Sequence, residues 1–140
     1  MVCVYCGHAT YVLNSRPQKR LNQVWRRRQC SSCKAVFTTI EGVDATQALR
    51  VSSNKRYEPF SRDKLLLSIY DSLRHRKTAT EDATAITATI LSHLYPFITD
   101  TVLVRDDIAK TTALVLGRFD KAAATSYRAF HPLSERSEAT

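Results

Sequence analysis

Four cysteines occupy two pairs in the first quarter of this 140-residue chain. Two residues lie between the cysteines of each pair, and residues 7–29 separate the pairs, which are Cys3 with Cys6 and Cys30 with Cys33. Two such pairs can direct four thiolates at one tetrahedral ion, and zinc is the metal that suits four sulfur ligands. Because four ligands leave no open position for water, the spacing predicts one structural zinc ion per chain.

A redox dithiol and ordinary buried cysteines are the alternative interpretations of these pairs. A redox pair belongs beside a βαβ pattern, which the sequence lacks, and buried cysteines have no reason to pair at this spacing. His8 follows the first pair and is a fifth candidate ligand. Because four cysteines already complete the site, we expect His8 instead to face solvent or to form a hydrogen bond beside it.

Positive charge is concentrated in the same part of the chain. Residues 1–40 contain no Asp or Glu and carry +7 of the formal net charge of +8. The basic residues are Arg16, Lys19, Arg20, Arg26, Arg27, Arg28 and Lys34. A block without carboxylates attracts polyanions, so we expect it to contact nucleic acid. A solvated basic tail is the alternative, but this block also holds the cysteines and alternates apolar with polar residues.

This alternation predicts three strands, at 10–15, 21–28 and 35–40. On the second strand, Arg26 and Arg28 would point to one face, and Trp25 and Arg27 to the other. Arginine suits a nucleic-acid surface because its planar fork bridges phosphate oxygens or binds a guanine edge. Trp25 either stacks on a base or sugar or packs on the core of the ribbon, and both interpretations stay open.

The chain divides near 41–47, where the stretch at 41–44 predicts a short connector between this module and a second pattern. Residues 49–51 and 56–60 predict a β-hairpin around the turn at 52–55. Apolar residues then recur at helical spacing, and residues 102–104 are too short to assign. The expected helix starts are Ser61, Thr80, Asp106 and Asp120. The fold class is therefore α+β: an N-terminal zinc-ribbon β module followed by a mostly helical domain with an opening hairpin.

The sequence also excludes several classes of protein. With 44% hydrophobic and 24% charged residues, the composition is globular. No run of about 18 apolar residues exists, so we expect no membrane helix. The N-terminus does not fit a signal peptide, so we expect a cytoplasmic, nucleoid-associated protein with reduced cysteines. The catalytic motifs of nucleotide hydrolases and serine hydrolases are absent, which argues against an enzyme.

Several motifs occur in a diagnostic order beside the cysteines: NSRP at 14–17, RRRQC at 26–30 and FTTIE at 37–41. Together they resemble the NrdR family of bacterial repressors, which control ribonucleotide reductase genes. The resemblance covers residues 1 to about 130. It implies a DNA-binding zinc ribbon at 1–45, a nucleotide-sensing and oligomerising ATP-cone at 46–132, and a tail at 133–140. The DNA contacts that it implies are Arg16, Arg26, Arg27 and Arg28.

The second part of the chain resembles the ATP-cone through Glu58, Pro59, Phe60 and Lys64. This resemblance implies ATP or dATP as effector. The implied nucleotide-binding residues are Val51, Lys55, Arg56, Glu58, Phe60, Lys64 and Tyr127. By residue type alone, Glu58 would lie on the hairpin surface, and Phe60 and Tyr127 would lie in the core.

The hairpin also departs from the family pattern. The family usually has a basic pair before the turn, where this chain has Ser52 and Ser53. The turn lacks the expected glycine and has Asn54 and Lys55 instead.

The sequence therefore predicts a zinc-dependent, adenine-nucleotide-responsive repressor. It would act as a homo-oligomer on double-stranded operator repeats upstream of ribonucleotide reductase genes. One alternative is a zinc-ribbon accessory factor that binds RNA or RNA polymerase. Another is a detached regulatory domain that acts in trans on a reductase.

Overall fold

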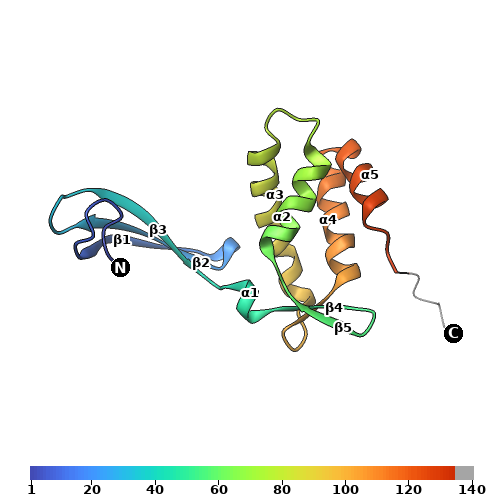
Figure 1. Cartoon of the computed structure of the whole chain (residues 1–140), viewed down its shortest axis with the longest axis horizontal. Helices are drawn as coiled ribbons and strands as arrows, with labels where there is room; N and C mark the ends of the chain where they lie inside the picture. Colours follow the sequence, from blue (N-terminus) through green and yellow to red (C-terminus); the bar gives the residue numbers. More distant parts are fainter. Residues whose placement is uncertain (135–140) are drawn as a thin grey trace. The chain divides into compact units, whose positions relative to one another are not determined.

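The computed structural model describes residues 1–134, with the backbone alone at 45 and 46. Residues 135–140, most of the predicted tail at 133–140, lie outside the described part. The chain divides into two compact units, Met1–Asp44 and Ala45–Thr140. The first, the ribbon unit, is a β-sheet module, and the second, the helical unit, is mostly α-helical (Figure 1). This arrangement confirms the predicted α+β class.

The ribbon unit is a three-stranded antiparallel sheet in the order β1-β2-β3. Its strands are β1 (Thr10–Gln18), β2 (Gln23–Cys30) and β3 (Val36–Gly42). A short 3₁₀ turn, η1 (Lys19–Leu21), connects β1 to β2, so the second strand begins two residues later than predicted. The register of β1 against β2 shifts between Val12 and Asn14, which marks a β-bulge.

Very little of the ribbon unit is buried. Among its residues, only Cys3 and Cys30 are buried, and every residue of β1 after Thr10 is exposed. A sheet without a side-chain core has almost no hydrophobic stabilisation of its own. The backbone ladder and the cysteine cluster must therefore hold the ribbon.

The helical unit begins with a small mixed sheet. Its strands β4 (Arg50–Ser53), β5 (Arg56–Pro59) and β6 (Val102–Val104) lie in the order β5-β4-β6, with β6 parallel to β4. The β4–β5 hairpin confirms the predicted hairpin, but its turn is shorter than predicted, because Ser52 and Ser53 belong to β4 and only Asn54 and Lys55 lie between the strands. Residues 102–104, unassigned from the sequence, form β6.

Five helices make up most of the described part of this unit. They are α1 (Ala45–Ala48), α2 (Arg62–Leu73), α3 (Ala79–Leu94), α4 (Arg105–Phe119) and α5 (Lys121–Phe130), with a 3₁₀ turn, η2 (Tyr95–Phe97), after α3. Helix α1 is a single turn that the sequence analysis did not predict.

Two of the four predicted helix starts are confirmed by their capping bonds. The Ser61 side chain accepts a hydrogen bond from the Lys64 amide at 3.2 Å, and the Asp120 side chain accepts one from the Ala123 amide at 3.0 Å.

The other two predicted helix starts were wrong. Thr80 lies inside the first turn of α3, which begins at Ala79. Helix α4 begins at Arg105, one residue before Asp106, because β6 runs directly into it.

The core of the helical unit is a continuous apolar cluster in which the hairpin residues Val51 and Phe60 join the helices. The fully buried side chains include Ile69, Leu73, Ile90, Leu94, Leu103 and Leu116. Burying each such side chain contributes about 1.5–3 kcal/mol. Within residues 1–134, none of the helices has the length and apolarity needed to cross a membrane.

A polar network links the loop after α2 to the junction of α4 and α5. Arg76 Nε lies 2.9 Å from Asp82 Oδ2, and Arg76 Nη1 lies 3.2 Å from Asp120 Oδ2. His75 Nε2 lies 2.9 Å from the same Asp120 oxygen. The amide of Ala123, then His75 and Arg76, hold the pKa of Asp120 at about 2. The network therefore ties the loop after α2 to the first turn of α3 and to the start of α5, with Asp120 ionised.

Candidate functional site

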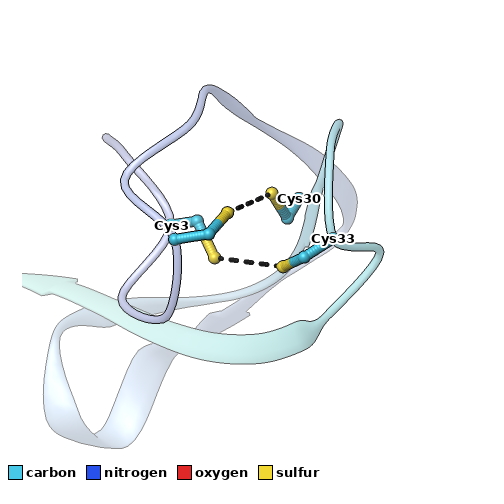
Figure 2. Close-up of side chains that lie close together, drawn as sticks. Cys3, Cys30 and Cys33 are labelled. Atoms are coloured by element: carbon cyan, nitrogen blue, oxygen red, sulfur yellow. Dashed lines mark hydrogen bonds between the residues drawn. The ribbon is translucent and has the colours of Figure 1, made fainter.

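The four cysteine sulfur atoms all lie within 4.8 Å of one another. The Sγ atoms of Cys3 and Cys33 are 3.7 Å apart, and those of Cys6 and Cys30 are 3.4 Å apart. Figure 2 shows Cys3, Cys30 and Cys33 with their sulfur atoms turned toward one another. Four sulfur ligands about 2.3 Å from a tetrahedral zinc ion lie roughly 3.8 Å from each other. The cysteines are therefore positioned to bind one zinc ion.

Backbone amides stabilise the sulfur atoms as thiolates. The amide of Tyr5 donates to Cys3 Sγ at 3.4 Å, and that of Ser32 donates to Cys30 Sγ at 3.3 Å. Burial raises the pKa of Cys30, but the backbone of Cys33 and Ser32 and the neighbouring thiols outweigh it and lower this pKa to about 6. At Cys33 the backbone of Ala35 lowers the pKa, but the neighbouring thiols and burial outweigh it and raise this pKa to about 12. Because the thiolate is the metal-binding form, the arrangement favours Cys30 as the first sulfur to ionise.

The turns that carry the two pairs are alike. The residue after each second cysteine has left-handed backbone, with φ of 74° at Gly7 and 62° at Lys34. This conformation turns the chain back toward the metal position. His8 is exposed, and its Nδ1 lies 3.1 Å from the carbonyl oxygen of Cys6. The histidine thus supports the loop and is not part of the four-sulfur cluster.

On one face of the ribbon, two arginines already have partners. Arg26 Nη2 lies 2.8 Å from Glu41 Oε2, and Arg28 Nε donates to Thr39 Oγ1 at 3.1 Å. Both partners belong to β3. These two guanidinium groups therefore join β2 to β3.

The opposite face of the ribbon leaves its arginines unengaged. Arg27 is the exposed residue of β2, and Asn14 lies opposite it on β1. Two positions away, Trp25 lies between Arg16 on β1 and Ile40 on β3. Trp25 is half-buried on this face. Within residues 1–134, the side chains of Arg16 and Arg27 form no hydrogen bond or ion pair, so both can reach a partner.

In the helical unit, five of the seven predicted nucleotide-binding residues line one cavity of about 240 Å³. These residues are Val51, Glu58, Phe60, Lys64 and Tyr127. Phe60 and Tyr127 are buried and form apolar walls, as their residue types suggested. Lys64 Nζ lies 3.4 Å from Glu58 Oε2 in an exposed ion pair.

The other two predicted residues lie elsewhere on the hairpin. Arg56 lines a neighbouring cavity that shares Val51 and Glu58 with the first. Lys55 lies in the hairpin turn and lines neither cavity. Asn54 and Lys55 have φ of 48° and 64°, so they form the left-handed two-residue turn in which a glycine was expected.

Sequence reasoning missed several residues of the 240 Å³ cavity. Arg105, Ile108 and Ala109 line it from α4, and His131 lines it from the end of α5. The His131 ring stacks on Tyr127, with centroids 4.1 Å apart and an interplanar angle of 11°. The available signal was the apolar run at 102–104. Assigned as a strand beside β4, it would have brought the start of α4 to the hairpin.

Comparison with known proteins supports one family. The family model described as "Transcriptional repressor NrdR-like, N-terminal domain" matches residues 1–41. The transcriptional repressor NrdR of Rhodospirillum centenum is 34% identical over 128 residues, which cover 91% of this chain and 82% of the relative. NrdR of Maricaulis maris is 32% identical over 140 residues, covering 96% of this chain and 86% of the relative.

A third relative matches more strongly over a shorter segment. NrdR of Symbiobacterium thermophilum is 40% identical over 81 residues, which cover 58% of this chain and about half (54%) of that relative. The two longer matches extend across both units, so the relationship is not confined to the ribbon. The chain therefore belongs to the NrdR family of transcriptional repressors.

Proposed function

We propose that this chain is a zinc-dependent DNA-binding repressor of ribonucleotide reductase operons, and that adenine nucleotides control it. It acts at the nucleoid in the cytoplasm as a homo-oligomer and catalyses no reaction. The observation that carries this proposal is an exposed arginine face on a ribbon whose four cysteines can hold zinc.

The two ribbon faces have different roles in this proposal. Arg26 and Arg28 are engaged with β3, so their main contribution is to the sheet. Arg16 and Arg27 lie on the opposite face with Trp25 between their positions. Free guanidinium groups bind phosphates or guanine edges, and a half-buried indole can stack on a sugar or base. The Arg16–Trp25–Arg27 face is therefore the proposed DNA-binding face.

The helical unit is the proposed sensor. Its cavity combines apolar walls at Phe60 and Tyr127 with a cation at Lys64, which suits a base attached to phosphates. ATP or dATP bound there would change how copies of the chain pack together. The number of ribbons that reach adjacent operator repeats would change with it, so DNA affinity would change through avidity.

DNA binding is tested by measuring affinity for a duplex from upstream of a ribonucleotide reductase operon and for a scrambled duplex. Both are measured at two salt concentrations, with and without each nucleotide. We expect preference for the operator, a steep loss of affinity with salt, and a nucleotide-dependent oligomer size in light scattering. Arg27→Ala should weaken operator binding about tenfold or more. Arg26→Ala, one residue away on the other face, is the matched control and should have a smaller effect.

Other outcomes would contradict the proposal. Equal affinity for operator and scrambled DNA, together with tighter binding to RNA or RNA polymerase, would favour an accessory factor instead. Equal losses of operator affinity in Arg26→Ala and Arg27→Ala would show that the two ribbon faces do not differ in DNA binding. Zinc content, measured for each variant, separates a lost contact from a lost fold.

A further inference from the structure

The nucleotide cavity has little positive charge on its hairpin side. Ser52 and Ser53 stand in β4 where a basic pair would face phosphates. Lys64 shares the cavity with Glu58, and the two side chains form an ion pair at 3.4 Å. A nucleoside triphosphate carries several negative charges, so one cation beside one carboxylate leaves most of them unmatched.

The sheet brings another cation to the same cavity. Strand β6 runs parallel to β4, and Val104 pairs with Ser52. Arg105 follows Val104 as the first residue of α4 and lines the cavity together with Lys64. A positive charge absent from β4 is thus present at the end of the neighbouring strand.

The Arg105 side chain is available for a ligand. It is exposed, and within residues 1–134 it makes no hydrogen bond or ion pair. Its charge acts on the cavity wall: burial raises the pKa of Tyr127, and Arg105 is among the groups that oppose this rise. The guanidinium group therefore lies close enough to the cavity to influence its lining.

Helix α4 contributes both a cation and apolar side chains to the cavity lining. Ile108 and Ala109 lie three and four residues after Arg105, on the same helical face, and all three line the cavity. Leu65 of α2 adds a further apolar side chain. One helix thus offers an apolar surface for a base and, one turn earlier, a planar cation for phosphate oxygens.

We infer that Arg105 binds the phosphates of the adenine nucleotide, in place of a basic pair on the hairpin. This inference rests on the proposed nucleotide-sensing function. It assigns a binding role to a residue that is not among the nucleotide-binding residues implied by the resemblance.

Calorimetry on the full chain tests the assignment with four ligands: ATP, dATP, inorganic tripolyphosphate and adenosine. Arg105→Ala should weaken binding of the three phosphate-containing ligands by about tenfold to a hundredfold, because it removes a charge-assisted bond. Adenosine binding should be unchanged. Arg118→Ala, in the last turn of the same helix and outside the cavity lining, is the matched control and should bind all four ligands like the parent.

A rescue variant tests the idea of replacement directly. Ser53 lies two residues after Val51 on β4 and lines the neighbouring cavity, which shares Val51 and Glu58 with the cavity that Arg105 lines. Ser53→Lys in the Arg105→Ala background should recover most of the lost affinity for ATP and tripolyphosphate. Unchanged zinc content and circular dichroism show that each variant is folded.

Three results would overturn the inference. Parent-like ATP affinity in Arg105→Ala would show that the phosphates lie elsewhere, while the proposed sensor would stand. An equal loss of adenosine binding would assign Arg105 to the nucleoside. A parent chain that binds none of the four ligands would overturn both the inference and the nucleotide part of the proposed function.

Discussion

The ribbon unit and the helical unit are stabilised in opposite ways. The ribbon unit buries only Cys3 and Cys30, whereas the helical unit has a continuous apolar cluster that includes its hairpin. A module of about 40 residues cannot bury enough apolar surface to fold on its own. The four cysteines are positioned to bind one zinc ion, which would stabilise the ribbon as side-chain packing stabilises the helices.

The two units also use their charges differently. The ribbon unit, residues 1–44, carries +5, because seven basic residues there stand against Glu41 and Asp44, and residues 45–140 carry the remaining +3 of +8. The helical unit pairs Arg76 with Asp82 and Asp120 inside its own structure. The ribbon leaves Arg16 and Arg27 without partners among the described residues. A module stabilised by metal can therefore keep its surface charge for another molecule.

Removing the metal should have the largest effect, and the two units should respond to it differently. Chelation of zinc, or Cys30→Ser, should unfold the ribbon and leave the helical unit folded, because metal binding supplies most of the folding free energy of the ribbon. Trp25 is the single tryptophan of the chain, so its fluorescence reports on the ribbon alone. Far-ultraviolet circular dichroism reports on the helices.

Cys30→Ser protein with one zinc ion per chain and parent-like tryptophan fluorescence would show that Cys30 is not a ligand. Loss of helical signal on chelation would show that the units are not independent. Metal content and both optical signals are measured on the same sample.

A substitution that creates a cavity in the helical core should destabilise the helical unit and leave the ribbon unit unchanged. Ile90 is fully buried, and Ile90→Ala should lower the free energy of unfolding of the helical unit by about 2–5 kcal/mol. Urea denaturation followed by circular dichroism measures this change. Zinc content and tryptophan fluorescence in buffer should stay at parent values, and a decrease in either would break the comparison.

Acid should act on the two units at different pH. The pKa of Asp120 is about 2 in the folded protein, below its reference value of 3.8. The ionised carboxylate therefore stabilises the folded helical unit by about 2 kcal/mol. This stabilisation is complete above pH 3.8 and is lost as the pH falls through 2. The ribbon should release zinc at higher pH, because protons compete with the metal for thiolates. Asp120→Asn should flatten the acid dependence of helical stability, measured by urea denaturation, and leave zinc release unchanged. A parallel shift of both would contradict this assignment.

The smallest expected changes in stability concern two lysines that have left-handed backbone. Lys34 in the ribbon and Lys55 in the hairpin have φ of 62° and 64°. Glycine avoids the steric cost of this conformation, so each substitution to glycine should stabilise its own unit by about 0.5–1 kcal/mol. Lys34→Gly should tighten zinc binding in a chelator competition, and Lys55→Gly should raise the urea midpoint of the helical unit. A change in the other unit would contradict their independence.

Local patterns were sufficient for much of the fold. Cysteine spacing predicts a shared site because two short turns suffice to bring each pair together. Ser61 and Asp120 predict helix starts because a capping bond joins residues three apart. The predicted helix starts at Thr80 and Asp106 were wrong because the path of the preceding chain decides where those helices begin. Helix propensity does not describe that path.

By itself, the sequence determined the grouping of the four cysteines, the excess of positive charge, the α+β class and the alternation that separates Arg27 from Arg26 and Arg28. Each of these follows from residue types and from spacing that repeats within short segments. Tertiary structure alone decided that Arg26 is engaged by Glu41, and that Arg105 and His131 share a cavity with the hairpin. Such contacts join residues far apart in sequence. They depend on a strand register and on packing that no local pattern encodes.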